Sequence, residues 1–258
     1  MAVFGDVTTA VGDDYVAVVE IRRPPNNYFD VDLIASLADA MEALDTDPHA
    51  RAAVMCSEGK HFCAGAAFGK GGDRDESNEE GKRLYGEAVR LFATKTPVVA
   101  AVQGAAIGGG LGVACYADFR VGVAEARMAA NFARLGFHHG FGLTVTLPQI
   151  IGQQRSLEML YTGRRLKGEE AESIGLLDEL VPSERLRDVA HARAVEIAAS
   201  APLAVESIRQ TMRGHLAQAV AAATDHEWAE QTRLRLTADF SEGVRATAER
   251  RPGNFKGA

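Results

Sequence analysis

The 258 residues of the chain are enough to bury one large core, and a single α/β unit of this size is ordinary. Hydrophobic residues make up 47% of the sequence and charged residues 24%, which is typical of globular rather than disordered proteins. The formal net charge of −7 argues against nucleic-acid binding, which needs clustered Lys and Arg. This net charge is still compatible with a local basic patch that binds a small phosphorylated ligand.

Cysteine content and hydropathy predict the cellular setting. The three cysteines, Cys56, Cys63 and Cys115, are odd in number and lack CxxC spacing, so we expect neither a disulfide framework nor a metal site. We interpret Cys63 and Cys115 as small buried hydrophobic residues. No segment approaches the apolar length of a membrane span, and residues 1–14 lack the pattern of a signal peptide. These features predict a cytoplasmic protein with no membrane partner.

Strands and helices alternate along the first part of the chain. Runs of β-branched and small apolar residues predict strands over 15–21, 52–56, 98–102, 119–123 and 127–129. Asp30 is a predicted N-cap, and apolar residues recur after it at helical spacing, namely Leu33, Leu37, Met41 and Leu44. Further helices are predicted over 84–92, 156–161, 168–174, 183–200 and from 202 onward. The polar, Gly-rich residues 69–80 predict a mobile surface loop or lid.

This order of elements predicts an α/β core over residues 1–200 and a helical C-terminal region over residues 201–258. The C-terminal helices are amphipathic, yet they follow a core that is already complete. We therefore expect part of their apolar surface to contact neighbouring subunits, including Leu203, Val205, Ile208 and Met212. The C-terminal region is accordingly predicted to mediate oligomerisation.

Two loops of small residues carry the chemical information. The strand over 52–56 leads into FCAGA at 62–66, and the strand over 98–102 leads into GAAIGGG at 104–110. Small residues let a ligand approach the backbone, and two converging N–H groups would form an oxyanion hole. Either loop alone is better explained by tight helix packing and turns. The GxGxxG spacing of a dinucleotide site and the Lys-Ser/Thr of a P-loop are both absent.

Together and in this order, the motifs resemble the enoyl-CoA hydratase/isomerase (crotonase) superfamily over essentially the whole chain. The matching segments are RPPNN at 23–27, HFCAGA at 61–66, QGAAIGGG at 103–110, ADFR at 117–120, LEMLYTG at 157–163, AESIGL at 171–176, VP at 181–182 and RPGNFK at 251–256. The resemblance implies a spiral of ββα units with a C-terminal helical subdomain that forms trimers or dimers of trimers.

The resemblance also implies the ligand and the residues that hold it. A thioester carbonyl would be bound by the backbone N–H groups of Ala66 and Gly109. Coenzyme A would contact the segment that starts at Arg23 and the carbonyl of Ala64. Phe255 and Lys256 match positions that reach the adenine and phosphates, often from a neighbouring subunit. Coenzyme A enters as part of the acyl-CoA substrate, and no separate cofactor is expected.

The reactive carboxylates of the family are missing. The two hydratase Glu positions correspond to Gly112 and Phe132. The isomerase or dehalogenase carboxylate, four residues after the Gly of Leu135-Gly136, corresponds to Gly140. The Asp that often follows the first loop is Ala67. Hydration of an enoyl thioester needs a base that activates water and an acid that protonates carbon, and these residues supply neither.

His138 and His139 precede Gly140 and are the candidates to replace the carboxylates. Histidine titrates near neutrality, which suits it to proton transfer. The alternative is that one or both are structural and hydrogen-bond the Gly-rich backbone around them. We interpret His61, His191, His215 and His226 as surface residues.

We therefore predict an acyl-CoA-processing enzyme, a lyase or isomerase, that acts through a thioester enolate held in a backbone oxyanion hole. One alternative is a hydrolase or C–C-cleaving enzyme for a β-keto or cyclic acyl-CoA, which would use the same hole. The other is a non-catalytic acyl-CoA-binding paralogue, which the missing carboxylates favour.

Overall fold

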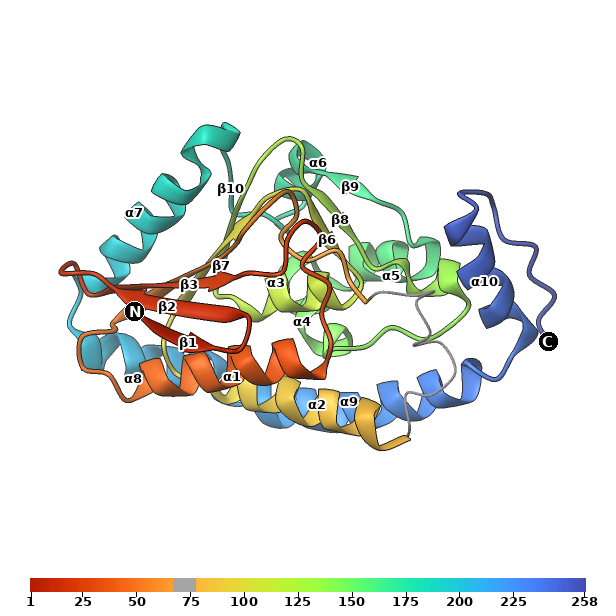
Figure 1. The fold of residues 1–258 in the computed structure, drawn as a ribbon, viewed down its shortest axis with the longest axis horizontal. Coiled ribbons are helices and arrows are strands. Elements are labelled where there is room, and N and C mark those ends of the chain that lie inside the picture. The colour runs from red at the N-terminus through yellow and green to blue at the C-terminus, as the bar shows by residue number, and fades with distance from the viewer. Residues whose placement is uncertain (67–77) are drawn as a thin grey trace.

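The computed structural model describes residues 1–66 and 78–258, and Figure 1 shows how their elements are arranged. Most of the loop predicted over 69–80 lies outside the described residues. Its last residues, Glu79 and Glu80, belong instead to the first turn of a helix. In the described part of the chain, no helix combines the length and apolar character needed to cross a bilayer.

Two β-sheets form the centre of the protein. Among the described residues, the larger sheet has seven strands in the order β1-β2-β3-β4-β5-β7-β10, and the smaller has three in the order β6-β8-β9. The strands are β1 (Ala2–Phe4), β2 (Val7–Val11), β3 (Val16–Ile21), β4 (Ala52–Ser57), β5 (Val98–Val102), β6 (Ala105–Ile107), β7 (Phe119–Gly122), β8 (Arg127–Ala129), β9 (Leu166–Lys167) and β10 (Glu179–Leu180). The strands predicted from the sequence are confirmed, with shifts of one residue at some ends.

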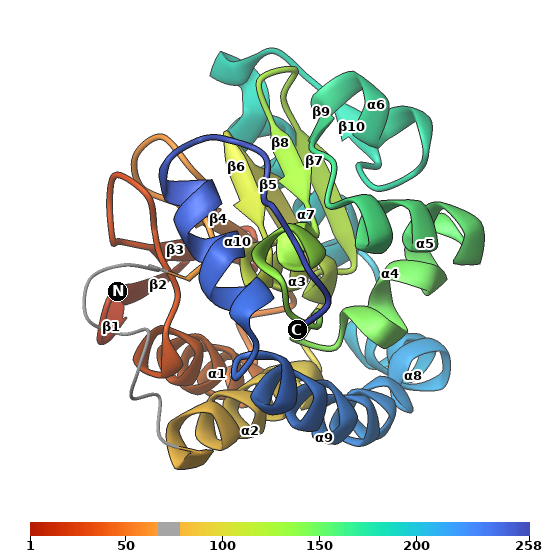
Figure 2. The same cartoon turned by 90° about the vertical axis from the view of Figure 1, so that its right-hand side faces the viewer.

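Helices surround both sheets. They are α1 (Val31–Asp45), α2 (Asn78–Ala93), α3 (Gly109–Tyr116), α4 (Leu143–Ile151), α5 (Gln153–Thr162), α6 (Gly168–Ser173), α7 (Leu186–Ala198), α8 (Pro202–Arg213), α9 (Leu216–Leu234) and α10 (Ala238–Ala248), with 3₁₀ helices η1 (Asn131–Leu135) and η2 (Ser183–Arg185). Figures 1 and 2 both show α1, α2 and α9 side by side along one edge. The predicted N-cap of α1 is confirmed, because the Asp30 carboxylate accepts a hydrogen bond from the Leu33 N–H at 2.9 Å.

Successive segments repeat one path between the sheets. From β5 the chain enters β6 of the smaller sheet and then α3, and from β7 it enters β8 and then α4 through η1. β4 follows the same course, since Cys63 after it forms a parallel bridge with Ala106 of β6. The strands β3, β4, β5 and β7 are parallel neighbours. The chain therefore winds as a spiral of strand–strand–helix turns, as predicted.

Both faces of the larger sheet are buried at its central strands β4 and β5, which explains the continuous apolar runs in these strands. Alternate residues of β5 face opposite ways: Val98, Ala100 and Val102 belong to the main core, and Val99 and Ala101 to a second core. The second core is covered by α7, whose apolar residues Leu186, Ala190, Ala194 and Ala198 recur at helical spacing. The main core lies on the opposite face, beneath α1, α2 and α3.

The hairpin β1–β2 at the start of the chain was not predicted. It adds antiparallel to β3, so the larger sheet is mixed rather than parallel throughout. In β2 only Val7 and Thr9 are buried, and Ala2 and Val3 of β1 are exposed. An edge strand with so little buried surface has a weak hydrophobic pattern, which is why this hairpin could not be recognised from the sequence.

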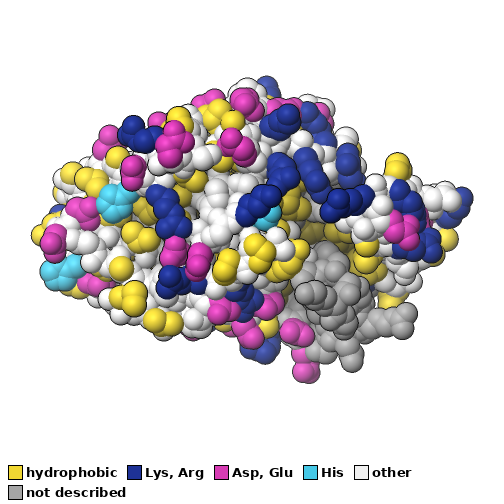
Figure 3. Space-filling model, turned by 45° about the horizontal axis from the view of Figure 1, so that its top comes forward, with side chains coloured by type: hydrophobic (Ala, Val, Ile, Leu, Met, Phe, Trp, Pro, Cys, Tyr) yellow, Lys and Arg dark blue, Asp and Glu magenta, His cyan; other side chains and the backbone are white. Residues whose placement is uncertain are grey.

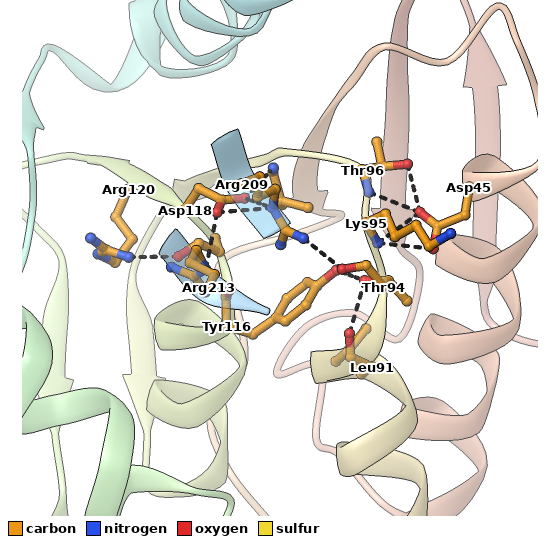
Figure 4. A network of polar contacts seen from close by, with 12 residues as sticks. Asp45, Leu91, Thr94, Lys95, Thr96, Tyr116, Asp118, Arg120, Arg209 and Arg213 are labelled. Atoms are coloured by element: carbon orange, nitrogen blue, oxygen red, sulfur yellow. Dashed lines mark hydrogen bonds and ion pairs between the residues drawn. The ribbon is translucent and has the colours of Figure 1, made fainter. Parts of the chain in front are cut away.

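A network centred on Asp118 fixes α8 to the larger sheet (Figure 4). The Asp118 carboxylate accepts a hydrogen bond from the Val98 N–H at 2.8 Å and forms an ion pair with Arg209 of α8 at 3.1 Å. Arg209 also donates to the Thr94 carbonyl at 2.6 Å, and Arg213 donates to the Tyr116 carbonyl at 2.7 Å. Polar contacts, rather than apolar burial, therefore hold α8 in place.

The apolar residues of α8 lie largely in solvent. Leu203 is 80% exposed, Ile208 63% and Met212 68%, whereas Val205 is half-buried. The main core does not end at residue 200, since Leu216 and Val220 of α9 and Phe240 belong to it. The domain boundary there stays a prediction, and the chain after it contributes to the same core.

The exposed apolar residues of α8 generate a prediction about assembly. Large apolar side chains in this number are normally covered by a partner. Because the family resemblance implies trimers or dimers of trimers, we expect the protein to form a trimer or hexamer. Multi-angle light scattering at micromolar concentration measures the mass directly. Replacing Ile208 and Met212 by Glu should shift the mass toward the 27.5 kDa of one chain. A monomeric wild-type protein would contradict the prediction.

Candidate active site

Backbone hydrogen bonds join the two Gly-rich loops directly. The Phe62 N–H donates to the Gln103 carbonyl at 2.8 Å, and the Cys63 N–H donates to the Ala105 carbonyl at 2.9 Å. The Ile107 N–H donates back to the Cys63 carbonyl at 3.1 Å. These bonds extend the pairing of β4 and β5 beyond the ends of both strands. The loops therefore lie against each other at the carboxyl edge of the larger sheet.

Glycine is required where the loops meet. Gly65 has a φ of +85°, and a Cβ atom there would lie 2.8 Å from the Ile107 carbonyl oxygen. A Cβ atom on Gly110 would lie 2.2 Å from the Cys63 carbonyl oxygen. Both distances are shorter than any side chain tolerates, so the absence of a side chain is what lets the two backbones approach.

Two backbone N–H groups beside this junction have no hydrogen-bond acceptor among the described residues. Gly109 is the first residue of α3, and its N-cap, Gly108, has no side chain that could cap the helix. Among the described residues, neither the Gly109 N–H nor the Ala66 N–H donates a hydrogen bond to the protein. The first N–H groups of a helix have no internal partner, and the helix dipole makes that end attractive to negative charge.

A cavity of about 520 Å³ opens in front of these groups. Ala64, Ala66 and Gly109 border it, so the structure brings together three of the residues predicted from the sequence. Apolar residues from several elements form much of the remaining wall, namely Phe29, Leu84, Phe132, Leu135, Phe137 and Phe141. A cavity of this size with an apolar wall and a few polar groups is typical of a small-molecule site.

The cavity is locally basic although the chain carries a net charge of −7. Among the described residues, four arginines border it, Arg127, Arg165, Arg235 and Arg250, against two acids, Asp30 and Glu80. Figure 3 shows Lys and Arg side chains gathered in a band on this face of the molecule. A basic border of this kind suits a ligand that carries phosphate groups.

Three predicted coenzyme A contacts do not border the cavity within one chain. Arg23 forms ion pairs with Asp6 and with Asp30, the latter at 2.7 Å. Phe255 is 42% exposed, and the Lys256 N–H donates to the Asp239 carboxylate at 2.6 Å. Their predicted roles stay predictions.

The two candidate histidines lie behind the cavity wall. Phe137, Gly140 and Phe141 of the same loop border the cavity, and His138 and His139 do not. His138 Nδ1 lies 2.8 Å from the His139 carbonyl oxygen, which can only accept, so Nδ1 carries the proton. The two imidazole rings stack on each other, with their centroids 4.1 Å apart.

His139 is held by a chain of hydrogen bonds that ends at a buried carboxylate. Its Nε2 lies 2.8 Å from the Thr144 hydroxyl oxygen, and that hydroxyl donates to Glu227 at 2.6 Å. The Thr144 oxygen therefore accepts the proton of Nε2. Glu227 is fully buried and also accepts hydrogen bonds from the Gly142 and Thr144 N–H groups. Burial, together with the charges of His138 and His226, lowers the pKa of His139 to about 3.

The positions of the missing carboxylates are occupied by other groups. A Cβ atom on Gly112 would lie 2.6 Å from the ring of Phe141, so no side chain fits at the first hydratase position. Phe132 at the second position is buried and borders the cavity. A Cβ atom on Gly140 would lie 2.0 Å from the Tyr85 hydroxyl oxygen. Other side chains therefore fill the space that the missing carboxylates would need.

The sequence did not identify several residues at this cavity. Tyr85 of α2 and Gln231 of α9 border it, and their positions depend on helix packing that no local motif encodes. His61, interpreted as a surface residue, is half-buried and accepts a hydrogen bond from the Ala105 N–H at 3.1 Å. Burial and the charges of Arg127 and Lys60 lower the pKa of His61. The position of His61 directly before the first loop was the sequence feature that could have placed it at the site.

The interpretation of the cysteines is confirmed. Cys63 and Cys115 are fully buried, and burial raises the pKa of the Cys63 thiol to about 12 and that of Cys115 to about 11. Neither thiol forms the reactive thiolate at neutral pH.

The lowered pKa of His139 predicts how stability responds to acid. The unfolded chain binds a proton at this residue below about pH 6.5, whereas the folded chain excludes it until about pH 3. Stability should therefore fall as the pH drops through this window. Between about pH 7 and about pH 4.5, wild type should lose about 2–3 kcal/mol more unfolding free energy than His139→Gln. Urea denaturation measures this difference. The exposed His215→Gln is the control, and parallel pH profiles for wild type and His139→Gln would contradict the prediction.

Comparisons with known proteins agree with this fold. Residues 12–258 match the family model described as enoyl-CoA hydratase/isomerase. The chain is 33% identical over 257 residues to a probable enoyl-CoA hydratase of Mycobacterium bovis, covering 93% of this chain and 89% of that protein. It is 37% identical over 199 residues to a glyoxysomal fatty acid beta-oxidation multifunctional protein of Cucumis sativus, which covers 75% of this chain but only 27% of that longer protein.

A solved structure extends the comparison to three dimensions. The crystal structure of an enoyl-CoA hydratase/isomerase from Pseudoalteromonas atlantica superposes with a TM-score of 0.86 at 27% identity, and covers 97% of this chain and 100% of that one. The spiral of strand–strand–helix turns is thus the crotonase fold, and the chain belongs to the enoyl-CoA hydratase/isomerase family.

Proposed function

We propose that the protein binds an acyl-CoA thioester and stabilises the enolate of its carbonyl through the N–H groups of Ala66 and Gly109. The observation that carries this proposal is the junction of the two loops, where neither N–H group has an acceptor among the described residues and both border one cavity. Donors fixed by the backbone are already oriented when negative charge develops on the carbonyl oxygen, so they stabilise it without reorganising.

The border of the cavity supports coenzyme A as the carrier of the acyl group. The phosphates of coenzyme A are anionic, and Arg127, Arg165 and Arg250 would neutralise them. The carbonyl of Ala64 stands beside the proposed hole and can accept a hydrogen bond from the carrier. Phe255 and Lys256, which lie outside the cavity of their own chain, would contact coenzyme A bound to a neighbouring subunit.

Which reaction follows enolate formation is a separate proposal. A lyase or isomerase reaction needs a group that moves a proton, and the positions of Gly112, Phe132 and Gly140 provide none. His138 and His139 stay the candidates. The hydrogen bonds of His139 hold its ring toward Thr144 rather than the cavity, which favours a positioning role for that residue.

A non-catalytic acyl-CoA-binding protein is the second candidate function. The packing of Phe141 against Gly112 favours it, because the Phe141 ring fills the first hydratase position and no other acid or base stands there. Screening a panel of acyl-CoA thioesters for both binding and turnover separates the two functions. Turnover of any thioester in the panel supports the enzyme, and binding without turnover supports the second candidate.

The closed hydratase position predicts slow hydration of crotonyl-CoA. Each positioned acid or base contributes about 10²–10⁴-fold to a rate, so the wild-type rate should fall at least that far below an ordinary hydratase. Gly112→Glu should not restore hydration, because the new side chain collides with Phe141. Overpacking there should lower the free energy of unfolding by about 1–3 kcal/mol.

The matched control for this variant is Gly86→Glu. Gly86 also lies in a helix, but no atom is within 4 Å of the place its Cβ would take, so the same substitution should leave stability unchanged or improve it. Ultraviolet absorbance at the enoyl thioester band follows the hydration, and chemical denaturation follows the stability. Robust hydration by wild type would contradict the assignment of the two positions.

The proposed hole is tested by Ala66→Pro, which removes one of the two N–H donors. Loss of one such donor should lower turnover by about 10²–10³-fold on whichever thioester the panel identifies. Ala66→Gly keeps the N–H and serves as the control for altered side-chain volume. Circular dichroism and thermal unfolding establish that the Pro variant is folded. Full turnover by a correctly folded Ala66→Pro protein would exclude Ala66 as a donor.

A further inference from the structure

Phe29 contacts both of the loops that carry the proposed N–H donors. Its backbone N–H donates to the Gly65 carbonyl at 3.2 Å, which fixes its main chain to the first loop. Its ring packs on the second loop, because a Cβ atom on Gly109 would lie 2.1 Å from Phe29 Cζ. Standard backbone dimensions then put the edge of the ring within about 5 Å of the Gly109 nitrogen. An aromatic ring therefore stands beside the proposed oxyanion hole.

A second aromatic ring approaches the residue that precedes this donor. A Cβ atom on Gly108 would be in ordinary van der Waals contact with the Phe132 ring, 3.7 Å from its Cζ. The peptide group between Gly108 and Gly109 carries the donor N–H, so Phe29 and Phe132 both lie close to the backbone that holds it. Both rings also border the cavity. A thioester whose oxygen is bound by this N–H would place its first acyl carbons beside the two rings.

Neighbouring rings hold these two in place. Phe29 meets Phe141 edge to face, with the ring centroids 5.9 Å apart, and Phe132 meets Phe137 in the same way at 5.5 Å. Aromatic rings prefer this geometry, because the positive edge of one ring meets the negative face of the other. All four rings border the cavity. The wall is thus ordered before a ligand arrives, which reduces the entropy lost on binding.

We propose that the acyl group bound here carries an aromatic ring within one or two carbons of the thioester carbonyl, and that this ring packs against Phe29 and Phe132. The inference rests on the proposed binding of acyl-CoA in this cavity and adds the class of acyl group. An aryl ring gains from edge-to-face contact in addition to the burial of its apolar surface. It also has fewer torsions to fix than an alkyl chain with the same number of carbons, which lowers the entropic cost of binding.

The test compares three thioesters whose acyl groups have equal numbers of carbons: phenylacetyl-CoA, cyclohexylacetyl-CoA and octanoyl-CoA. The first two share the same connectivity of heavy atoms and differ only in whether the ring is aromatic. Isothermal titration calorimetry measures the affinity of each. We expect wild type to bind phenylacetyl-CoA about threefold to tenfold more tightly than cyclohexylacetyl-CoA, the effect of one aromatic pair. A wall that acts only through the hydrophobic effect would favour cyclohexylacetyl-CoA instead, because a saturated ring is the more apolar.

Three variants make the result specific. Phe29→Leu keeps an apolar side chain but removes the ring, so it should weaken phenylacetyl-CoA about threefold to tenfold and change cyclohexylacetyl-CoA by less than about twofold. Phe132→Leu tests the second ring in the same way, and gives an independent answer if Phe29→Leu does not fold. Phe119→Leu is the matched control, since Phe119 is 39% exposed on β7 and does not border the cavity. It should bind all three thioesters as wild type does. Thermal unfolding of each variant accompanies the titrations.

The outcomes distinguish this inference from the proposed function beneath it. Equal wild-type affinity for phenylacetyl-CoA and cyclohexylacetyl-CoA, or a preference for the second, overturns the inference and leaves acyl-CoA binding intact. A preference for phenylacetyl-CoA that survives in both Phe29→Leu and Phe132→Leu also overturns it, because the preference would then arise elsewhere in the protein. Failure of wild type to bind any of the three thioesters overturns acyl-CoA binding and the inference together.

Discussion

The hydrogen bonds between the two loops are the constraint on which the cavity depends. Cys63 pairs with Ala105 and Ile107, and this pairing continues the parallel ladder of β4 and β5 past the ends of the strands. Parallel strands deliver their carboxyl ends to one edge of a sheet, so both loops arrive at the same place. Residues 65 and 110 are glycines, so neither has a side chain that would hold the two loops apart. This arrangement of the backbone determines where the N–H groups of Ala66 and Gly109 lie.

A second constraint comes from α9, whose buried polar face reaches the far wall of the cavity. Glu227 and Gln231 are four residues apart and therefore share one side of the helix. Glu227 binds the backbone at Gly142 and Thr144, and Gln231 binds the carbonyl of His138. A fully buried carboxylate with three hydrogen-bond donors is costly to disturb. The C-terminal region thus shapes the cavity, in addition to the oligomerisation predicted for it.

The sequence predicts whatever depends on neighbours along the chain. The spacing of Leu33, Leu37 and Met41 locates α1, and the continuous apolar run over 98–102 locates a strand buried on both faces. The small residues of the two loops reveal where a ligand can approach the backbone. Tyr85 and Gln231 could not be found in this way, because each is an unremarkable helix residue until α2 and α9 pack around Gly140. The histidines show the same limit of prediction from sequence. Their residue type was evident, but the direction of the His139 ring depends on its contacts with Thr144 and, through Thr144, with Glu227.

The chemistry available to this cavity differs from that of a site built on carboxylates. Backbone N–H groups do not titrate, so an enolate held by Ala66 and Gly109 would be stabilised equally at every pH at which the fold persists. The pKa of His139, about 3, keeps that ring neutral over the same range. A pH dependence of turnover near neutrality would therefore have to come from another group of the protein or from the substrate itself.

A substrate that carries its own acidifying keto group needs less help from a protein base than an enoyl thioester does, because the enolate is then shared between two carbonyl groups. Gly112, where Phe141 leaves no room for a carboxylate, is compatible with such a substrate.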